Sequence, residues 1–117
     1  MTVDQMLHHV SLTMEGALGR NAVKPVKFPL PAWVMKFMII HVPWPKGAPT
    51  TPEWKVVGDR FDFETERARC LTLIDEIAAK PFNSQWPIHA NFGDVGADYY
   101  SRLHAKHLDH HLKQFSA

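Results

Sequence analysis

The sequence predicts one all-α domain, an antiparallel bundle of helices. Four stretches can be read as helices, most of them with apolar residues at helical spacing, and connectors rich in proline or glycine separate them. No run of residues has the pattern of a strand, and no internal repeat is present. A chain of 117 residues is long enough for one such domain and not for two.

The first predicted helix runs from Val3 to Leu18. Thr2 and Gln5 have the spacing of a capping box at its start, and Gly19 is a natural stop at its end. A second helix is predicted from Pro31 to His41, with proline at the first helical position. Because this second helix is apolar on nearly every side, we expect it to be largely buried.

The third helix is predicted over residues 62–79 and the fourth over 97–115, with a loop at 81–96 between them. Residues 43–60, which hold four prolines and two glycines, form a long irregular loop of the kind that is often functional. The apolar stripe expected on the third helix consists of Phe63, Cys70, Ile74 and Ile77. Arg67 is expected in the same stripe, and we interpret Cys70 as a buried structural thiol.

Composition excludes several classes of protein. The formal net charge of +1 argues against a nucleic-acid-binding protein, which usually carries a clear basic excess. The most apolar stretch, residues 31–44, is shorter than the roughly 20 residues that a membrane span needs. The first ten residues lack the pattern of a signal peptide, and the one cysteine fits a reducing compartment. We therefore expect a cytoplasmic protein.

Histidine is the outlier of the composition, with eight residues, four of them between His104 and His111. At about 100° per residue, Tyr100, His107 and His111 share one face of the last helix. Two histidines one turn apart can chelate one divalent ion, and imidazole is a good ligand for zinc, nickel or iron.

Two ligands make a weak site, so a third must come from another helix. The first helix offers His8 and His9, and His9 lies nearer to the apolar stripe. Three histidines leave coordination positions open, as in catalytic rather than structural metal sites. The competing interpretation is that a histidine on an apolar face is a hydrogen-bonded core residue. A second alternative is that His8, His104 and His110, which lean toward the surface, are simply solvated.

The same segments resemble the DinB/YfiT-like superfamily. The resemblance is carried by QMLHHV at 5–10, HANFGD at 89–94 and LHAKHLDHHLKQF at 103–115, and it is strongest to a branch that ends in KHxxHHLxQF. It implies a four-helix bundle in which His9, His107 and His111 hold a divalent metal. Characterised members include metal-dependent thiol transferases and hydrolase-like enzymes.

One departure from that family concerns its usual first helix. Members have a long helix before the QMLxH helix, whereas this sequence starts at the QMLxH helix. A bundle without that helix would expose an apolar face, which is unfavourable by about 25 cal/mol per Å². We therefore expect a second copy of the chain to cover the face in a homodimer.

Several further residues are candidates for a pocket around the metal. These are Tyr100, His104, Gln114 and His89, and the tryptophans Trp33, Trp44, Trp54 and Trp86, which can equally pin loops to the core. Asp109, Glu15 and Asp4 are expected to be solvated surface residues.

Two functions follow from these observations. The first is a metal-dependent enzyme that carries out small-molecule or thiol transfer, or hydrolase-like chemistry. No glutamate accompanies the histidine pair as it does in HExxH hydrolases, which disfavours peptide hydrolysis. The alternative is a non-catalytic bundle that binds a metal or a small ligand and works as a homodimer.

Overall fold

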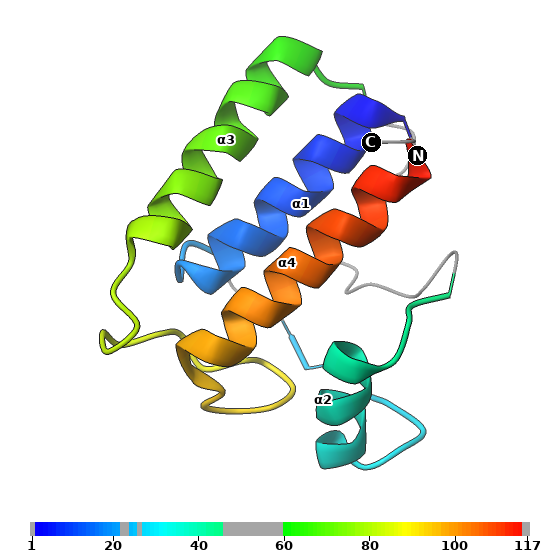
Figure 1. The fold of residues 1–117 in the computed structure, drawn as a ribbon, viewed down its shortest axis with the longest axis vertical. Coiled ribbons are helices and arrows are strands. Elements are labelled where there is room, and N and C mark those ends of the chain that lie inside the picture. The colour runs from blue at the N-terminus through cyan, green and yellow to red at the C-terminus, as the bar shows by residue number, and fades with distance from the viewer. Residues whose placement is uncertain (1, 22–23, 26, 46–59, 116–117) are drawn as a thin grey trace.

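The computed structural model describes residues 2–21, 24–25, 27–45 and 60–115 (Figure 1). It contains helices α1 (Val3–Ala17), α2 (Ala32–His41), α3 (Phe63–Ala79) and α4 (Gly96–Gln114). The described residues include no strand, only an isolated bridge between His89 and Gly93. The predicted all-α class is confirmed. Within these residues, no helix has the length and hydropathy needed to cross a bilayer.

Helices α3, α1 and α4 lie side by side with α1 in the middle, and α2 lies apart near the start of α4 (Figure 1). The residues of α1 and α3 that contact each other advance together along the chain, from His8–Glu66 to Glu15–Arg69, so these two helices run in the same direction. Between α1 and α4 the contacting residues rise in number on one helix as they fall on the other, so these two helices are antiparallel. The bundle therefore combines one parallel and one antiparallel pair, because a long crossover containing α2 connects α1 to α3.

The core has two parts, both built on α1. Between α1 and α3 the buried side chains are Met6, Val10, Met14, Cys70 and Leu73. Toward the other end of α1 they are Ala17, Trp86, Ala97 and Tyr100. Because α1 contributes to both clusters, it is the element against which the rest of the described chain is positioned.

The predicted helix ends lie within a residue of the observed ones. At the start of α1 the Thr2 backbone N–H donates to Gln5 Oε1 at 2.8 Å, as the capping-box spacing predicted. Asp62 caps α3 by accepting a hydrogen bond from the Thr65 backbone N–H at 2.9 Å. Gly19 follows α1 with a φ of 76°, a conformation that glycine adopts without strain.

The prediction that the second helix is largely buried is wrong. None of the residues of α2 is buried, and Trp33 and Phe37 are 75% and 60% exposed. The helix is attached to α4 at a few points, where Tyr99 Oη donates to the Lys36 carbonyl at 3.1 Å and Lys106 Nζ to the Ile39 carbonyl at 2.7 Å. Apolar composition thus failed to predict burial because α2 lies outside the space enclosed by α1, α3 and α4.

The apolar stripe of α3 is also shifted from its predicted position. Cys70 is buried as expected, but Phe63 is 44% exposed and Arg67 points to solvent. The buried face instead includes Glu66 and Leu73, in addition to Cys70. The reason is that α1 presents polar partners to this face near Glu66, which lets a carboxylate occupy a position that apolar periodicity assigns to a hydrophobic side chain.

Candidate metal centre

Three histidines from two helices converge on one point. His9 comes from α1, and His107 and His111 come from α4. The Nε2 atom of His107 lies 3.0 Å from that of His9 and 2.9 Å from that of His111. One ligand atom from each ring lies within 4.8 Å of the other two. His9 and His111 are buried and His107 is half-buried, so the cluster lies just below the surface.

Local structure explains why these rings meet. His107 and His111 are four residues apart on α4 and therefore lie one above the other on the side that faces α1. Because α4 runs antiparallel to α1, His111 lies against His9, and His107 lies between His9 and Thr13. The three rings are close to mutually perpendicular, with interplanar angles of 84°, 79° and 71°.

Two neighbouring side chains orient the α4 imidazoles. Gln114 Oε1 can only accept, so at 3.0 Å it accepts a hydrogen bond from the His111 Nδ1–H. The Thr13 hydroxyl donates its one proton to the Val10 carbonyl at 2.7 Å and therefore faces His107 Nδ1, at 3.4 Å, as an acceptor. Both contacts place the ring proton on Nδ1 and leave Nε2 with a lone pair directed into the cluster.

These lone pairs make the cluster a poor hydrogen-bonded network and a good ligand set. Two unprotonated Nε2 atoms 2.9 Å apart repel each other unless a cation lies between them. A metal–nitrogen distance of about 2.0–2.1 Å places ligand nitrogens about 2.9 Å apart at an octahedral angle and about 3.3 Å apart at a tetrahedral angle. The two observed separations match such a site, and imidazole donors suit zinc, nickel or iron.

Electrostatics keep the α4 ligands neutral. Burial lowers the pKa of His107 well below its usual 6.5, and positive charge on His9 or His111 would lower it further. Burial also lowers the pKa of His111, although the hydrogen bond to Gln114 opposes the change. The neutral imidazole is the form that binds a metal, so these rings are ready to act as ligands at neutral pH.

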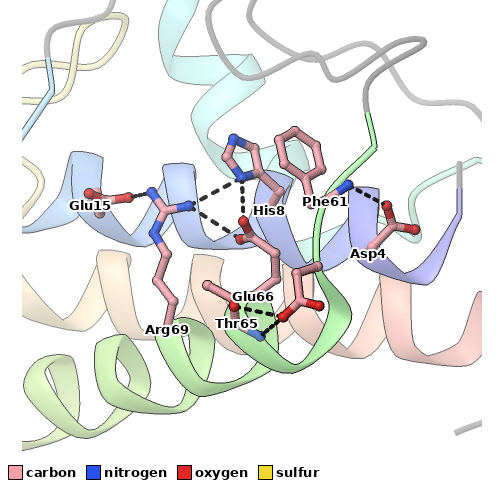
Figure 2. A network of polar contacts seen from close by, with 8 residues as sticks. Asp4, His8, Glu15, Phe61, Thr65, Glu66 and Arg69 are labelled. Atoms are coloured by element: carbon pink, nitrogen blue, oxygen red, sulfur yellow. Dashed lines mark hydrogen bonds and ion pairs between the residues drawn. The ribbon is translucent and has the colours of Figure 1, made fainter.

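His8, the alternative third ligand, lies elsewhere. Its Nδ1 is 3.1 Å from Glu66 Oε1, and its ring stacks on Phe61 with a centroid separation of 3.9 Å (Figure 2). Arg69 contacts Glu66 at 3.4 Å and also pairs with Glu15, whose side chain is partly exposed. Asp4 is likewise engaged, because its carboxylate accepts from the Phe61 backbone N–H at 3.0 Å. This network joins α1 to α3 on the side away from the histidine cluster.

The predicted pocket residues separate into two groups. Gln114 contacts the cluster directly through His111. Tyr100 and His104 lie on α4 toward its start, and His89 lies in the loop before α4, all three among aromatic rings. Tyr100 Oη donates to the Pro87 carbonyl at 2.9 Å, and His89 Nδ1 accepts from the Asn91 backbone N–H at 3.1 Å. These three line a packed region rather than the metal cluster.

His104 is the residue of this group with unusual chemistry. The interpretation that it is solvated is wrong, because it is 8% exposed and stacked on Tyr100. Within the part of the chain that the structure describes, its Nε2 has no hydrogen-bond partner, and burial lowers its pKa to about 4. His104 is therefore a neutral, buried imidazole one turn before His107.

Trp44 is a site residue that the sequence did not single out from the other tryptophans. Its ring centroid lies 5.7 Å from that of His107 and 5.4 Å from that of His110, while its Nε1 donates to the Ile39 carbonyl at 2.8 Å. Trp33 is exposed and Trp86 is in the core, whereas Trp54 lies outside the described residues. Trp44 follows α2 in a segment without regular secondary structure, where no hydrophobic periodicity predicts which way a side chain points. Most of the predicted 43–60 loop also lies outside the described residues.

A hollow of about 550 Å³ adjoins the cluster on this side. Its lining includes Trp44, Lys106, Asp109, His110, Lys113 and Gln114. Asp109 is solvated as predicted and forms an ion pair with Lys113 at 2.8 Å. Since Gln114 and Trp44 also contact His111 and His107, the hollow lies directly beside the candidate ligands.

Comparison with known families gives one result. The family described as "Protein of unknown function (DUF1569)" matches residues 2–117. The chain belongs to the DUF1569 family. The match includes α1 and α4, and with them all three clustered histidines. No significant match was found among curated proteins or among solved structures.

Proposed function

We propose that this DUF1569 protein is a cytoplasmic, metal-dependent enzyme of the DinB-like type, with His9, His107 and His111 as the ligands of one divalent ion. One observation supports this most strongly. The Nε2 atoms of His107 and His111 are oriented by Thr13 and Gln114 so that their lone pairs face each other at 2.9 Å. A bound cation removes the repulsion that this arrangement otherwise contains.

The ligand set indicates the kind of chemistry. A divalent ion on three neutral imidazoles keeps open positions and supplies a Lewis acid that polarises a substrate or lowers the pKa of a thiol. Asp109, the carboxylate among the residues that line the hollow, is already paired with Lys113. Because no unpaired carboxylate among these lining residues is available as a general base, the site favours small-molecule or thiol transfer over peptide hydrolysis.

Metal content tests the proposal directly. Protein purified without a histidine tag should contain about one zinc, nickel or iron per chain, and added metal should raise its thermal stability. At a free metal concentration of 100 times Kd, the gain in unfolding free energy is about 2.7 kcal/mol. His107→Ala and His111→Ala should abolish both the metal and the gain.

His110→Ala is the matched control for these variants. His110 lies on the same helix and its ring is 5.2 Å from that of His111, yet it is outside the ligand cluster. The control should retain metal. Absence of stoichiometric metal in the wild-type protein, or equal loss in all three variants, contradicts the proposal. A thiol-transfer assay with low-molecular-weight thiols then identifies the reaction.

The exposed face of α2 favours a second candidate, a non-catalytic metal- or ligand-binding bundle that works as a homodimer. Trp33 and Phe37 lie one turn apart and are mostly exposed, and large apolar patches of this kind mark interaction sites. Sedimentation should then show a dimer at micromolar concentration that Phe37→Glu converts to monomer. A compact wild-type monomer excludes this assembly, and turnover with a thiol substrate excludes the non-catalytic role.

A further inference from the structure

The hollow beside the histidine cluster has features of a binding site. Its volume of about 550 Å³ falls within the range of small-molecule pockets, which is roughly 300–1,000 Å³. Two of its lining side chains are also neighbours of the candidate ligands: Gln114 bonds His111, and Trp44 lies against His107. A molecule in the hollow therefore touches the same side chains that orient the cluster.

The charge of the hollow is positive. Lys106 Nζ donates to the Ile39 carbonyl at 2.7 Å and to the Val42 carbonyl, so within the described residues its partners are neutral backbone groups. Among the described lining residues the one carboxylate is that of Asp109, which lies 2.8 Å from Lys113. In the part of the chain that the structure describes, Lys106 is thus a cation of the lining without an anionic partner.

The apolar part of the hollow is the ring of Trp44. Its Nε1–H is used by the Ile39 carbonyl at 2.8 Å, so the ring offers a ligand an apolar surface rather than a donor. Lys106 Nζ lies 5.3 Å from the centroid of this ring. A flat apolar group and an anionic group can therefore be bound side by side, one on the indole and one at the ammonium.

The proposed metal ion would strengthen the preference of the hollow for an anionic group. Three neutral imidazoles contribute no negative charge, so a divalent ion on them keeps its full charge of about +2. We propose that the hollow binds a small organic carboxylate with a flat apolar body, which lies on Trp44 with its carboxylate toward Lys106 and the metal centre. The role of this molecule as substrate rests on the proposed function, whereas the selectivity of the hollow for it can be measured separately.

Calorimetric titration of the zinc-loaded protein with benzoate tests this inference. Benzoate should bind, and the neutral analogue benzyl alcohol should bind at least about tenfold more weakly, as expected for loss of a charged hydrogen bond. Acetate and inorganic phosphate, which lack the apolar body, should also bind more weakly than benzoate. Equal affinity for benzoate and benzyl alcohol, or tighter binding of phosphate, overturns the inference.

Variants of Lys106 test whether benzoate binds in the hollow. Lys106→Gln keeps an N–H donor for the backbone carbonyls but removes the charge, and it should weaken benzoate about tenfold. Lys106→Arg should restore binding, which separates loss of charge from loss of folding. The matched control is Lys80→Gln, because Lys80 also lies over a tryptophan, 5.1 Å from the ring centroid of Trp86, but outside the hollow. Equal effects of Lys106→Gln and Lys80→Gln overturn the inference.

The same titration in the absence of metal separates this inference from the proposed function. If the protein binds no zinc but still prefers benzoate through Lys106, the metal centre is wrong and the pocket assignment holds. If zinc binds to the histidine cluster but benzoate shows no preference over benzyl alcohol, the pocket assignment is wrong and the metal centre holds.

Discussion

Replacing His104 by leucine should make the stability of this protein less sensitive to acid. The imidazole is 8% exposed, its Nε2 has no hydrogen-bond partner among the described residues, and burial lowers its pKa from 6.5 to about 4. The unfolded chain therefore binds a proton at His104 over a pH range in which the folded chain does not. A histidine whose pKa is lower in the folded chain than in the unfolded chain destabilises the fold as the pH falls below the pKa of the unfolded chain.

The size of the effect follows from these two pKa values. At pH 5.5 protonation favours the unfolded state by RT ln 11, about 1.4 kcal/mol, because the unfolded pKa is near 6.5 and the folded pKa is about 4. At pH 7.5 the same contribution is below about 0.1 kcal/mol. Between these two pH values the wild-type protein should therefore lose about 1.3 kcal/mol more stability than His104→Leu.

Urea unfolding at the two pH values, with a chelator present in every sample, measures this difference. Leucine has a similar volume and no polar atom to leave unpaired, so the variant should be at least as stable as the wild type at pH 7.5. Asn91→Ala provides a control in the neighbouring loop that introduces no change in titratable groups. If His104→Leu loses as much stability between pH 7.5 and 5.5 as the wild type, His104 is not a buried neutral imidazole and the argument fails.

Three further outcomes are expected. Glu66→Gln should lower the unfolding free energy by about 1–3 kcal/mol, because it weakens a buried carboxylate that faces His8 and Arg69. Glu64→Gln, on the same helix but solvent-exposed, should change it by less than about 0.5 kcal/mol, and equal effects in urea unfolding would contradict the burial of Glu66. The Cys70 thiol, whose pKa burial raises, should react with an aromatic disulfide reagent only after denaturation; rapid reaction of the native protein would contradict its core position. Gln114→Ala should weaken metal binding roughly 10- to 100-fold, as measured by competition with a chromogenic chelator, whereas unchanged affinity would show that Gln114 does not orient its histidine ligand.

The helices could be predicted from the sequence because their signals are local. Caps and stops such as Gln5 and Gly19, together with apolar spacing, predicted helix bounds within a residue of those observed. The pairing of His107 with His111 is equally local, since residues four apart on any α-helix lie on one face. No knowledge of the neighbouring helices is needed for either prediction.

The error in α2 shows where local reasoning stops. Its apolar composition is compatible with a buried core helix and with an exposed interaction surface. Which of these applies depends on where the crossover between α1 and α3 places the helix, and the sequence contains no local signal for that position. The same holds for Trp44, because it lies in a segment without regular secondary structure, where sequence spacing does not predict which residues are its neighbours.

The choice of His9 over His8 as the third ligand depends partly on local sequence and partly on the tertiary structure. Adjacent residues differ by about 100° on a helix, so one of the two must face α4 and the other must face away. The sequence favoured His9 through its place beside the apolar stripe, and the structure decided the matter by pairing His8 with Glu66 and Phe61. Arg69, which completes that network, was not predicted because its partners on α1, His8 and Glu15, lie more than fifty positions away in the chain.

For this protein the sequence alone determined the helices and the histidine pair on α4, because both depend on the fixed rise and rotation of one helix. Only the tertiary structure decided that α1 brings His9 to that pair, that α2 remains exposed and that Lys106 and Trp44 form a hollow beside the cluster. Those outcomes depend on the direction and rotation of each helix relative to its neighbours, which are set by the packing of the whole chain rather than by any one segment.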